Sequence, residues 1–311
     1  MSAAVRRVVA TAPGKVNLSL RVGGADERGY HALATAFQAV DLLETVETTL
    51  PPETGQLTLS IDSRVRGEVP VDGSNLALRA AQLLRGETGT DLGAHLHITK
   101  RVPVAGGMGG GSADAAAALV ALNRLWQLGL ERGDLMRLGS QLGADVPFAV
   151  LGGTALGTGN GDQLRPVPAP APLTWLLVAP GGHLSTPAVF AAFDDLVATQ
   201  DAPSAVTPEP DVRQLAALAA GDVPAIAATL HNELQAPALQ LRPDLRDALA
   251  DIMDAGALAA IVSGSGPTLA ALVTDEAHGA LVQERLHSDR GDLESTLTTS
   301  TPHGARVIDE D

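Results

Sequence analysis

The chain has 311 residues, which is long enough for one large domain or for two ordinary domains with a real core. Its 36 acidic residues outnumber its 21 basic residues, and the net charge of −15 argues against general binding to nucleic acid or to an anionic membrane. The absence of cysteine excludes disulfides and thiolate metal sites. Residues 1–12 are too short and too mixed for a signal peptide, and no apolar run is long enough to span a membrane, so we expect a cytoplasmic protein.

The first half of the chain mixes strand patterns with helical ones. Apolar or β-rich runs predict strands at residues 5–12, 16–22, 40–50, 57–61 and 94–99, and a short strand within residues 154–161. Pro13-Gly14 is expected to interrupt the first two strands. Helical patterns occupy residues 76–84, 113–130 and 134–142, the first of them behind a capping segment at residues 72–75.

The second half begins with a proline-rich segment. Residues 166–172 contain four prolines, which predicts a boundary between a domain of residues 1–165 and a domain of residues 166–311. Strands are predicted at residues 174–178, 259–262 and 268–273, and helices at residues 212–220, 224–234 and 245–255. The last twenty residues are polar and weakly patterned, so we expect a frayed tail. Strands and helices in both halves predict a two-part α+β or α/β protein.

A glycine-rich stretch is the most informative feature of the chain. Five of the ten residues 103–112 are glycine, and an alanine-rich helical pattern follows at once. A bare loop that opens a helix exposes backbone N–H groups and the positive end of the helix dipole, which suits phosphate. The P-loop pattern is absent, and a dinucleotide-binding fingerprint is weakened but not excluded because a predicted strand precedes the loop. The sequence therefore favours a nucleotide site over a flexible linker.

Four other features of the sequence have both a functional and a purely structural interpretation. Lys15 follows a sharp turn and is either a phosphate-binding charge or a surface lysine. Asp145 lies between apolar residues, where a turn cap is slightly favoured over a general base. Tyr30-His31 can stack on a planar ring and hydrogen-bond its edge, or form an ordinary loop. Residues 263–267 favour a hairpin turn over a site.

Five segments together make the chain resemble the GHMP kinase superfamily and, within it, the family of kinases that act on diphosphocytidyl methylerythritol. They are residues 12–18 (APGKVNL), 26–33 (DERGYHAL), 103–112 (PVAGGMGGGS), 139–148 (GSQLGADVPF) and 263–268 (SGSGPT). The chain departs from the family pattern in three ways: Met108 replaces a leucine, Arg28 replaces an aspartate, and Gly110-Gly111 stand where many members have a magnesium-binding serine.

The resemblance implies a fold, a reaction and a set of site residues. The fold would be an α+β GHMP kinase fold, with a ribosomal-protein-S5-like N-terminal domain and a ferredoxin-like C-terminal domain. The reaction would be ATP-dependent phosphorylation of the 2-hydroxyl of 4-diphosphocytidyl-2-C-methyl-D-erythritol, in non-mevalonate isoprenoid synthesis. Asp145 would take the hydroxyl proton with the help of Lys15. Asn17 would lie near the alcohol.

Further residues would hold the two substrates. Tyr30 and His31 would bind the cytosine, with Thr186 and Phe190 as the far wall of its pocket. The ATP phosphates would contact Pro103, Val104, Ala105, Gly106, Gly107, Met108, Gly109, Gly110, Gly111, Ser112 and Ala113. Mg²⁺ would be held mainly by phosphate oxygens and water, and no protein ligand to it is assigned.

The partners implied are small molecules, without nucleic acid or membrane, and the expected state is a monomer or a weak homodimer. Three alternatives stay open at this point. The chain could be a homoserine or mevalonate kinase of the same superfamily, or a nucleotide sensor without catalysis. A nucleic-acid-binding module is the third, and the charge of −15 argues against it.

Overall fold

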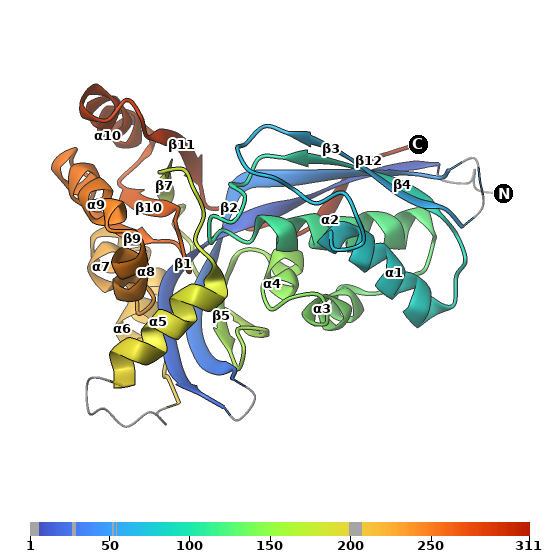
Figure 1. Cartoon of the computed structure of the whole chain (residues 1–311), viewed down its shortest axis with the longest axis horizontal. Coiled ribbons are helices and arrows are strands. Elements are labelled where there is room, and N and C mark those ends of the chain that lie inside the picture. Colours follow the sequence, from blue (N-terminus) through green and yellow to red (C-terminus); the bar gives the residue numbers. More distant parts are fainter. Residues whose placement is uncertain (1–5, 27–28, 52, 54, 199–206) are drawn as a thin grey trace.

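Two long antiparallel strands, β1 (Arg7–Ala25) and β2 (His31–Thr49), run through the molecule and carry the first sheet (Figure 1). The structure is a computed structural model that describes residues 6–26, 29–51, 53, 55–198 and 207–311. Residue 5, the predicted start of the first strand, lies outside the described residues. β1 does not break at Pro13-Gly14, so that prediction was wrong. The strand continues through a shift of register between these two residues, because a bulge tolerates a proline that cannot donate a ladder hydrogen bond.

The first sheet has the strand order β12-β1-β2-β4-β3, with β5 and β6 continuing from β2 and β8 beside β1. Its other strands are β3 (Leu57–Ser63), β4 (Ala94–Lys100), β5 (Thr154–Thr158), β6 (Gln163–Pro166), β8 (His231–Asn232) and β12 (Arg306–Glu310). Figure 1 shows helices against one face of this sheet, namely α1 (Leu76–Thr88), α2 (Gly110–Leu125), α3 (Arg132–Ser140) and α4 (Val146–Leu151). The many buried alanines of α2 let its backbone pack closely between the sheet and α1.

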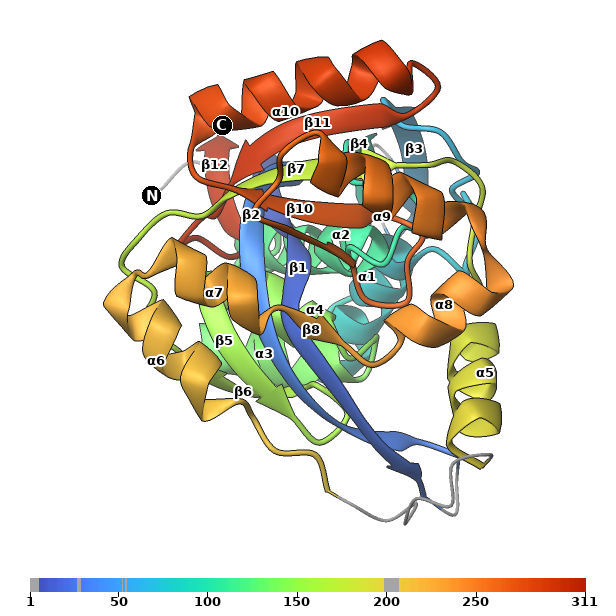
Figure 2. The same cartoon turned by 90° about the vertical axis from the view of Figure 1, so that its left-hand side faces the viewer.

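The second sheet has the order β11-β7-β10-β9 and is antiparallel throughout. Its strands are β7 (Thr174–Ala179), β9 (Ala259–Val262), β10 (Leu269–Val273) and β11 (Glu294–Thr299). This order is that of a ferredoxin-like domain, as predicted. Figure 2 shows the helices of this half, which are α5 (Thr186–Ala198), α6 (Val212–Ala220), α7 (Val223–Thr229), α8 (Gln235–Leu241), α9 (Asp244–Asp254) and α10 (Glu276–Asp289).

A shared apolar core joins the two sheets. Val16 and Leu18 of β1 pack in one cluster with Trp175 of β7 and Leu272 of β10. The opposite face of the second sheet packs against α9 and α10 in a separate cluster. The middle of β1 is therefore held from both sides, by α2 in the first half of the chain and by the second sheet.

Several boundaries differ from the sequence predictions. The prediction of a frayed tail was wrong, because the last residues form β12, which pairs with β1 and is fixed by ion pairs from Arg7 to Asp309 and from Arg124 to Glu310. The predicted helix at residues 224–234 ends at Thr229, because the next two residues form β8 against β1. α2 begins and ends earlier than residues 113–130. The sequence missed α5, α8, α10 and the first nine residues of β2.

Other predictions were confirmed. α6 and β9 have the predicted bounds, and Asn75 caps α1 by accepting a hydrogen bond from the backbone N–H of Ala77. In the described part of the chain, no helix combines the length and apolar character that a membrane span requires. β8 and β12 come from the second half of the chain and join the first sheet, and the division at residues 165 and 166 stays a prediction.

Candidate active site

A cavity of about 950 Å³ lies where β1, β2, the start of α2 and the turn between β9 and β10 meet. Most of the residues that the sequence singled out line it: Lys15, Asn17, Tyr30, His31, Pro103, Ala105, Gly106, Gly107, Gly109, Gly110, Gly111, Ser112, Asp145, Thr186 and Phe190. Three predicted ATP contacts do not. Met108 and Ala113 have no exposed surface, and Val104 lines a neighbouring cavity.

The glycine loop fits tightly against the turn between β9 and β10. Gly107 has a φ of 75°, and a Cβ there would lie 2.0 Å from the carbonyl oxygen of Ser263. A Cβ on Gly106 would lie 2.4 Å from Oγ1 of Thr268. The turn is a hairpin, as predicted, but Gly264 and Ser265 also line the cavity. The two glycine segments therefore form one wall of the site together.

The N-terminus of α2, which follows the glycine loop directly, lies at the cavity. Gly109 is the N-cap residue with a φ of 70°, and no side chain in the described part of the chain caps the helix. Gly110, Gly111 and Ser112 form the first turn and line the cavity. The N–H groups of a first turn have no partner within the helix, so this end of α2 can accept an anion.

Lys15 and Asp145 meet at the same wall. Nζ of Lys15 lies 3.6 Å from Oδ2 of Asp145, and the lysine side chain is only 8% exposed. Lys15 is therefore not a surface lysine. Asp145 occupies the N-cap position of α4, but its side chain makes no capping hydrogen bond. The slightly favoured interpretation of Asp145 as a turn cap is thus wrong for its side chain, which instead faces Lys15.

A short hydrogen-bond chain orients the lysine. Nζ of Lys15 donates to Oδ1 of Asn17 at 2.7 Å, and Nδ2 of Asn17 donates to Oγ1 of Thr35 at 2.8 Å. The backbone N–H of Lys15 donates to the carbonyl of Met108 at 3.0 Å. Phe37 places its ring centroid 5.7 Å from the ammonium. The position of Lys15 is therefore fixed relative to both β2 and the glycine loop.

An aromatic pocket forms the other end of the cavity. The ring of His31 lies 5.0 Å from that of Phe190, centroid to centroid. Nδ1 of His31 donates to the carbonyl of Gly23 at 2.8 Å, because a carbonyl can only accept, and Nε2 faces Oδ2 of Asp194 at 3.4 Å. Tyr30 lines the same end and is 61% exposed. The motif residues Glu27 and Arg28 lie outside the described residues.

Comparison with known proteins gives the family. The family model described as "GHMP kinases N terminal domain" matches residues 75–153, and the model described as "GHMP kinases C terminal" matches residues 214–292. A relative from Leifsonia xyli subsp. xyli, named 4-diphosphocytidyl-2-C-methyl-D-erythritol kinase, is 46% identical over 302 residues, which cover 96% of this chain and 98% of the relative. The chain belongs to the 4-diphosphocytidyl-2-C-methyl-D-erythritol kinase family.

Other relatives of this kinase agree. A protein of the same name from Clavibacter michiganensis subsp. michiganensis is 47% identical, with 97% of this chain and 96% of the relative covered. A crystal structure of a 4-(cytidine 5'-diphospho)-2C-methyl-D-erythritol kinase is 32% identical with a TM-score of 0.74, over 94% of this chain and 98% of that one. The homoserine kinase of Cytophaga hutchinsonii has the same TM-score at 22% identity over 97% of each chain, which shows the shared fold alone.

A buried charge cluster supports the glycine loop of the kinase. Nζ of Lys100 lies 2.6 Å from Oε1 of Glu44 and 2.7 Å from Oδ2 of Asp114, and all three side chains are almost fully buried. Glu44 also accepts hydrogen bonds from the backbone N–H groups of Arg101 and Val102, where β4 leads into the loop. Burial raises the pKa of Asp114 to about 7, Lys100 opposes this shift, and Glu44 adds to it. Burial also raises the pKa of Glu44.

Sequence reasoning missed several residues at the site. Leu33, Thr35 and Phe37 line the cavity from every second position of β2. This period of two is a strand signal, but the alanines between them have weak β-propensity and hid it. Asp194 was missed because α5 was not predicted, and nothing near it in the sequence indicated that it would contact His31.

Proposed function

We propose that the enzyme transfers the γ-phosphoryl group of ATP to the 2-hydroxyl of 4-diphosphocytidyl-2-C-methyl-D-erythritol. The observation that carries the proposal is the arrangement of a single cavity. Lys15 and Asp145 lie 3.6 Å apart on its wall, between the glycine loop at one end and the pocket of Tyr30, His31 and Phe190 at the other. Phosphoryl transfer needs a cradle for the nucleotide phosphates, a cation and a group that positions or deprotonates the alcohol, and the residues that line this cavity would supply all three.

The glycine loop and the start of α2 would bind the ATP phosphates. The unpaired N–H groups of the first helical turn are donors that do not reorganise during the reaction. The bare loop lets a ligand approach its backbone without meeting side chains. With an overall charge of −15, the protein needs such a local positive region to hold a triphosphate.

Asp145 would accept the proton of the alcohol. As its oxygen forms a bond to the γ-phosphorus, the bond from that phosphorus to the bridging oxygen of ADP breaks, and the proton passes to the carboxylate. The ammonium of Lys15 lies close enough to offset the negative charge that develops on the transferred group. Asn17 would keep the lysine aimed at this point through its 2.7 Å hydrogen bond.

Mg²⁺ fits this site as an ion carried by the nucleotide. Among the described residues there is no group of three or more His, Asp or Glu side chains that could hold a metal ion on its own. Mg²⁺ often binds through substrate phosphates, water and one or two carboxylates, and Asp145 is a carboxylate that lines the cavity. The bound Mg²⁺ would neutralise part of the negative charge of the phosphates.

The aromatic pocket would select the cytidine end of the substrate. Tyr30 and Phe190 offer ring faces for stacking, and His31 offers its backbone and its Nε2 for a base edge, since its Nδ1 already donates to Gly23. A small alcohol such as homoserine or mevalonate has no planar ring to occupy this pocket. The pocket therefore favours a nucleotide-bearing alcohol over those two substrates.

The test is an incubation of the purified enzyme with ATP and the diphosphocytidyl alcohol, followed by phosphorus NMR. We expect a new phosphate monoester resonance together with stoichiometric ADP. Turnover of homoserine or mevalonate instead would assign a different kinase, and ATP binding without turnover of any of the three alcohols would favour a nucleotide sensor. The expected cytoplasmic location and the expected monomer or weak homodimer stay predictions.

A further inference from the structure

We propose that Gln214 is a positioning residue that holds a bulge in β1 and thereby aims Lys15 and Asn17 at the reacting groups. The inference rests on the proposed function, because it assigns Lys15 to phosphoryl transfer. Gln214 belongs to α6, far along the chain from β1, and does not line the cavity. Its influence would therefore be exerted through β1.

The alternation of cavity-facing and outward-facing side chains along β1 is interrupted in the middle of the site. On β2, the residues that face the cavity are Leu33, Thr35 and Phe37, which follow the regular period of a strand. On β1 the cavity-facing residues are Lys15, Asn17 and then Leu20. One extra residue is therefore inserted into β1 between Asn17 and Leu20.

The pairing of the strands identifies the bulge. Asn17 lies opposite Phe37 and Ser19 lies opposite Ala36, so Leu18 has no partner of its own on β2. A bulge of this kind leaves backbone groups outside the ladder and redirects the neighbouring side chains, often next to an active site. The backbone groups that a bulge releases in a buried strand need another hydrogen-bond partner.

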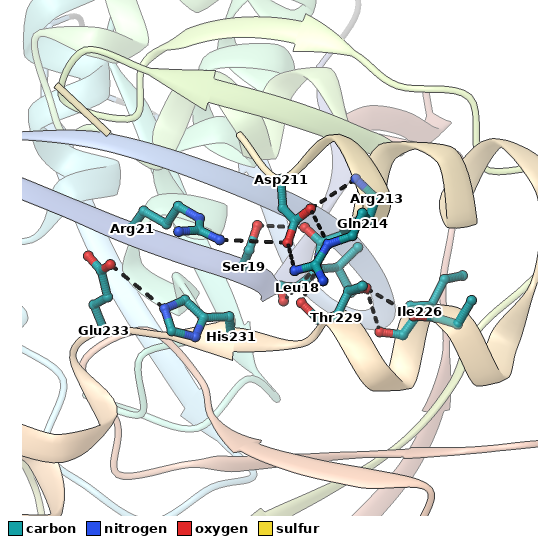
Figure 3. A network of polar contacts seen from close by, with 11 residues as sticks. Leu18, Ser19, Arg21, Asp211, Arg213, Gln214, Ile226, Thr229, His231 and Glu233 are labelled. Atoms are coloured by element: carbon teal, nitrogen blue, oxygen red, sulfur yellow. Dashed lines mark hydrogen bonds and ion pairs between the residues drawn. The ribbon is translucent and has the colours of Figure 1, made fainter. Parts of the chain in front are cut away.

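Gln214 supplies that partner, as Figure 3 shows. Its Nε2 donates to the carbonyl of Leu18 at 3.0 Å and to the carbonyl of Thr229 at 3.0 Å. Its Oε1 accepts from Oγ of Ser19 at 2.6 Å. Because both carbonyls can only accept, the orientation of the amide is fixed, and both of its N–H donors are used. Gln214 is only 1% exposed, so water cannot replace these bonds readily.

The bulge is linked to the lysine by consecutive hydrogen bonds. The carbonyl of Ser19 accepts from Oγ1 of Thr35 at 2.7 Å, and this hydroxyl accepts from Asn17, which in turn accepts from Lys15. A shift of the backbone at Ser19 would therefore move Thr35 and Asn17, and with them the ammonium. A second contact between β1 and α6 lies nearby, where Arg21 approaches Asp211 at 3.6 Å (Figure 3).

Kinetics of Gln214→Met test the inference. Methionine has a similar size but offers none of the three hydrogen bonds, so the bulge loses its support. We expect kcat to fall by about 10-fold to 100-fold, as for other small misplacements of catalytic groups, while KM for ATP changes by less than about 2-fold. Gln214→Glu, which keeps the size and can still accept from Ser19, is the second variant if Gln214→Met does not fold.

The matched control is Gln38→Met. Gln38 is also a glutamine of 1% exposure, and its amide bonds to Thr154 and to Trp175 rather than to the bulge. We expect this variant to lower the melting temperature as Gln214→Met does, yet to keep kcat within about 2-fold of the unmodified enzyme. A role of Gln214 in stability alone would make the two variants alike in kcat.

A double-mutant cycle with Asn17→Ala identifies the route of the effect. If Gln214 acts through Asn17 and Lys15, adding Gln214→Met to Asn17→Ala should lower kcat by less than about 2-fold further. Full additivity of the two losses would overturn the inference. So would a crystal structure of Gln214→Met that retains the contact between Nζ of Lys15 and Oδ1 of Asn17. Failure of the unmodified enzyme to phosphorylate the alcohol would instead contradict the proposed function, and this crystal structure would still decide the role of Gln214.

Discussion

Nζ of Lys15 on β1 lies 3.6 Å from Oδ2 of Asp145, the residue that precedes α4. The two residues come from distant parts of the sequence, and neither alone distinguishes chemistry from ordinary structure. Their proximity supports the proposed chemistry, because a nearly buried ammonium beside a partly exposed carboxylate opens onto the cavity that the glycine loop also lines.

Asp145→Asn should remove catalysis and leave binding intact. The amide keeps the shape of the side chain but cannot accept the proton of the alcohol, so we expect kcat to fall by about 10²-fold to 10⁴-fold. The affinity for CDP, measured by calorimetry, should change by less than about 3-fold, because Asp145 does not line the aromatic pocket. Full activity of this variant would rule out Asp145 as the base.

Gly107→Ala should weaken ATP binding. The new Cβ would collide with the carbonyl of Ser263 at 2.0 Å, and the φ of 75° adds strain, so the loop must move. We expect KM for ATP to rise by at least about 10-fold, since the displaced N–H groups would no longer reach the phosphates that we propose they bind.

Gly129→Ala is the matched control for this loop variant. Gly129 has a similar φ of 69°, but a Cβ there meets nothing within 4 Å. It should cost about 1 kcal/mol of stability through backbone strain and leave KM for ATP unchanged. Equal effects of the two substitutions on KM for ATP would show that the strain of a positive φ, and not the contact with Ser263, causes the loss of ATP binding.

Phe190→Ala should raise KM for the diphosphocytidyl alcohol. Stacking of a base on an aromatic ring contributes about 1–3 kcal/mol, so an increase of about 10-fold to 100-fold is expected. KM for ATP should stay the same, because Phe190 belongs to the end of the cavity with His31 and not to the glycine loop. An equal rise in both KM values would argue against a separate cytidine pocket.

Asp114 should make the stability of the enzyme fall as the pH rises. Its carboxyl group has a pKa of about 7 in the folded protein against 3.8 as the ordinary value, so between these values the folded state binds more protons than the unfolded state. The free energy of unfolding therefore decreases with rising pH over this window and levels off above about pH 7. Oδ1 of Asp114 finds no hydrogen-bond partner among the residues that the structure describes, which adds to the cost of charging this group.

Asp114→Asn is the variant that isolates this effect, with urea unfolding as the measurement. Relative to the variant, the unmodified enzyme should lose about 1–3 kcal/mol from about pH 5 to about pH 8, since one pKa unit corresponds to about 1.4 kcal/mol. Parallel stability curves for the two proteins would contradict the prediction. The raised pKa of Glu44 contributes in the same direction and remains in the variant.

Local signals in the sequence were enough for part of the fold. α6 has capping and helical patterns that agree with its final state, and its predicted bounds were correct. The prediction of a frayed C-terminal tail was wrong because β12 has little apolar pattern of its own. The strand is held by pairing with β1 and by ion pairs from other elements. α7 and β8 were predicted as one helix because only the pairing of His231 with Ser19 reveals the short strand that follows α7.

The residues to look for could be named from the sequence, because five spaced motifs contain a lysine, a Tyr-His pair, a glycine-rich loop, an aspartate and a second glycine turn. Which of these residues come into contact depends on the folded arrangement of the elements. Contacts such as those from Lys15 to Asp145, from His31 to Asp194 and from Gln214 to Leu18 join residues of distant elements. No local pattern encodes such contacts, since they depend on how the two sheets and α2 pack around the middle of β1.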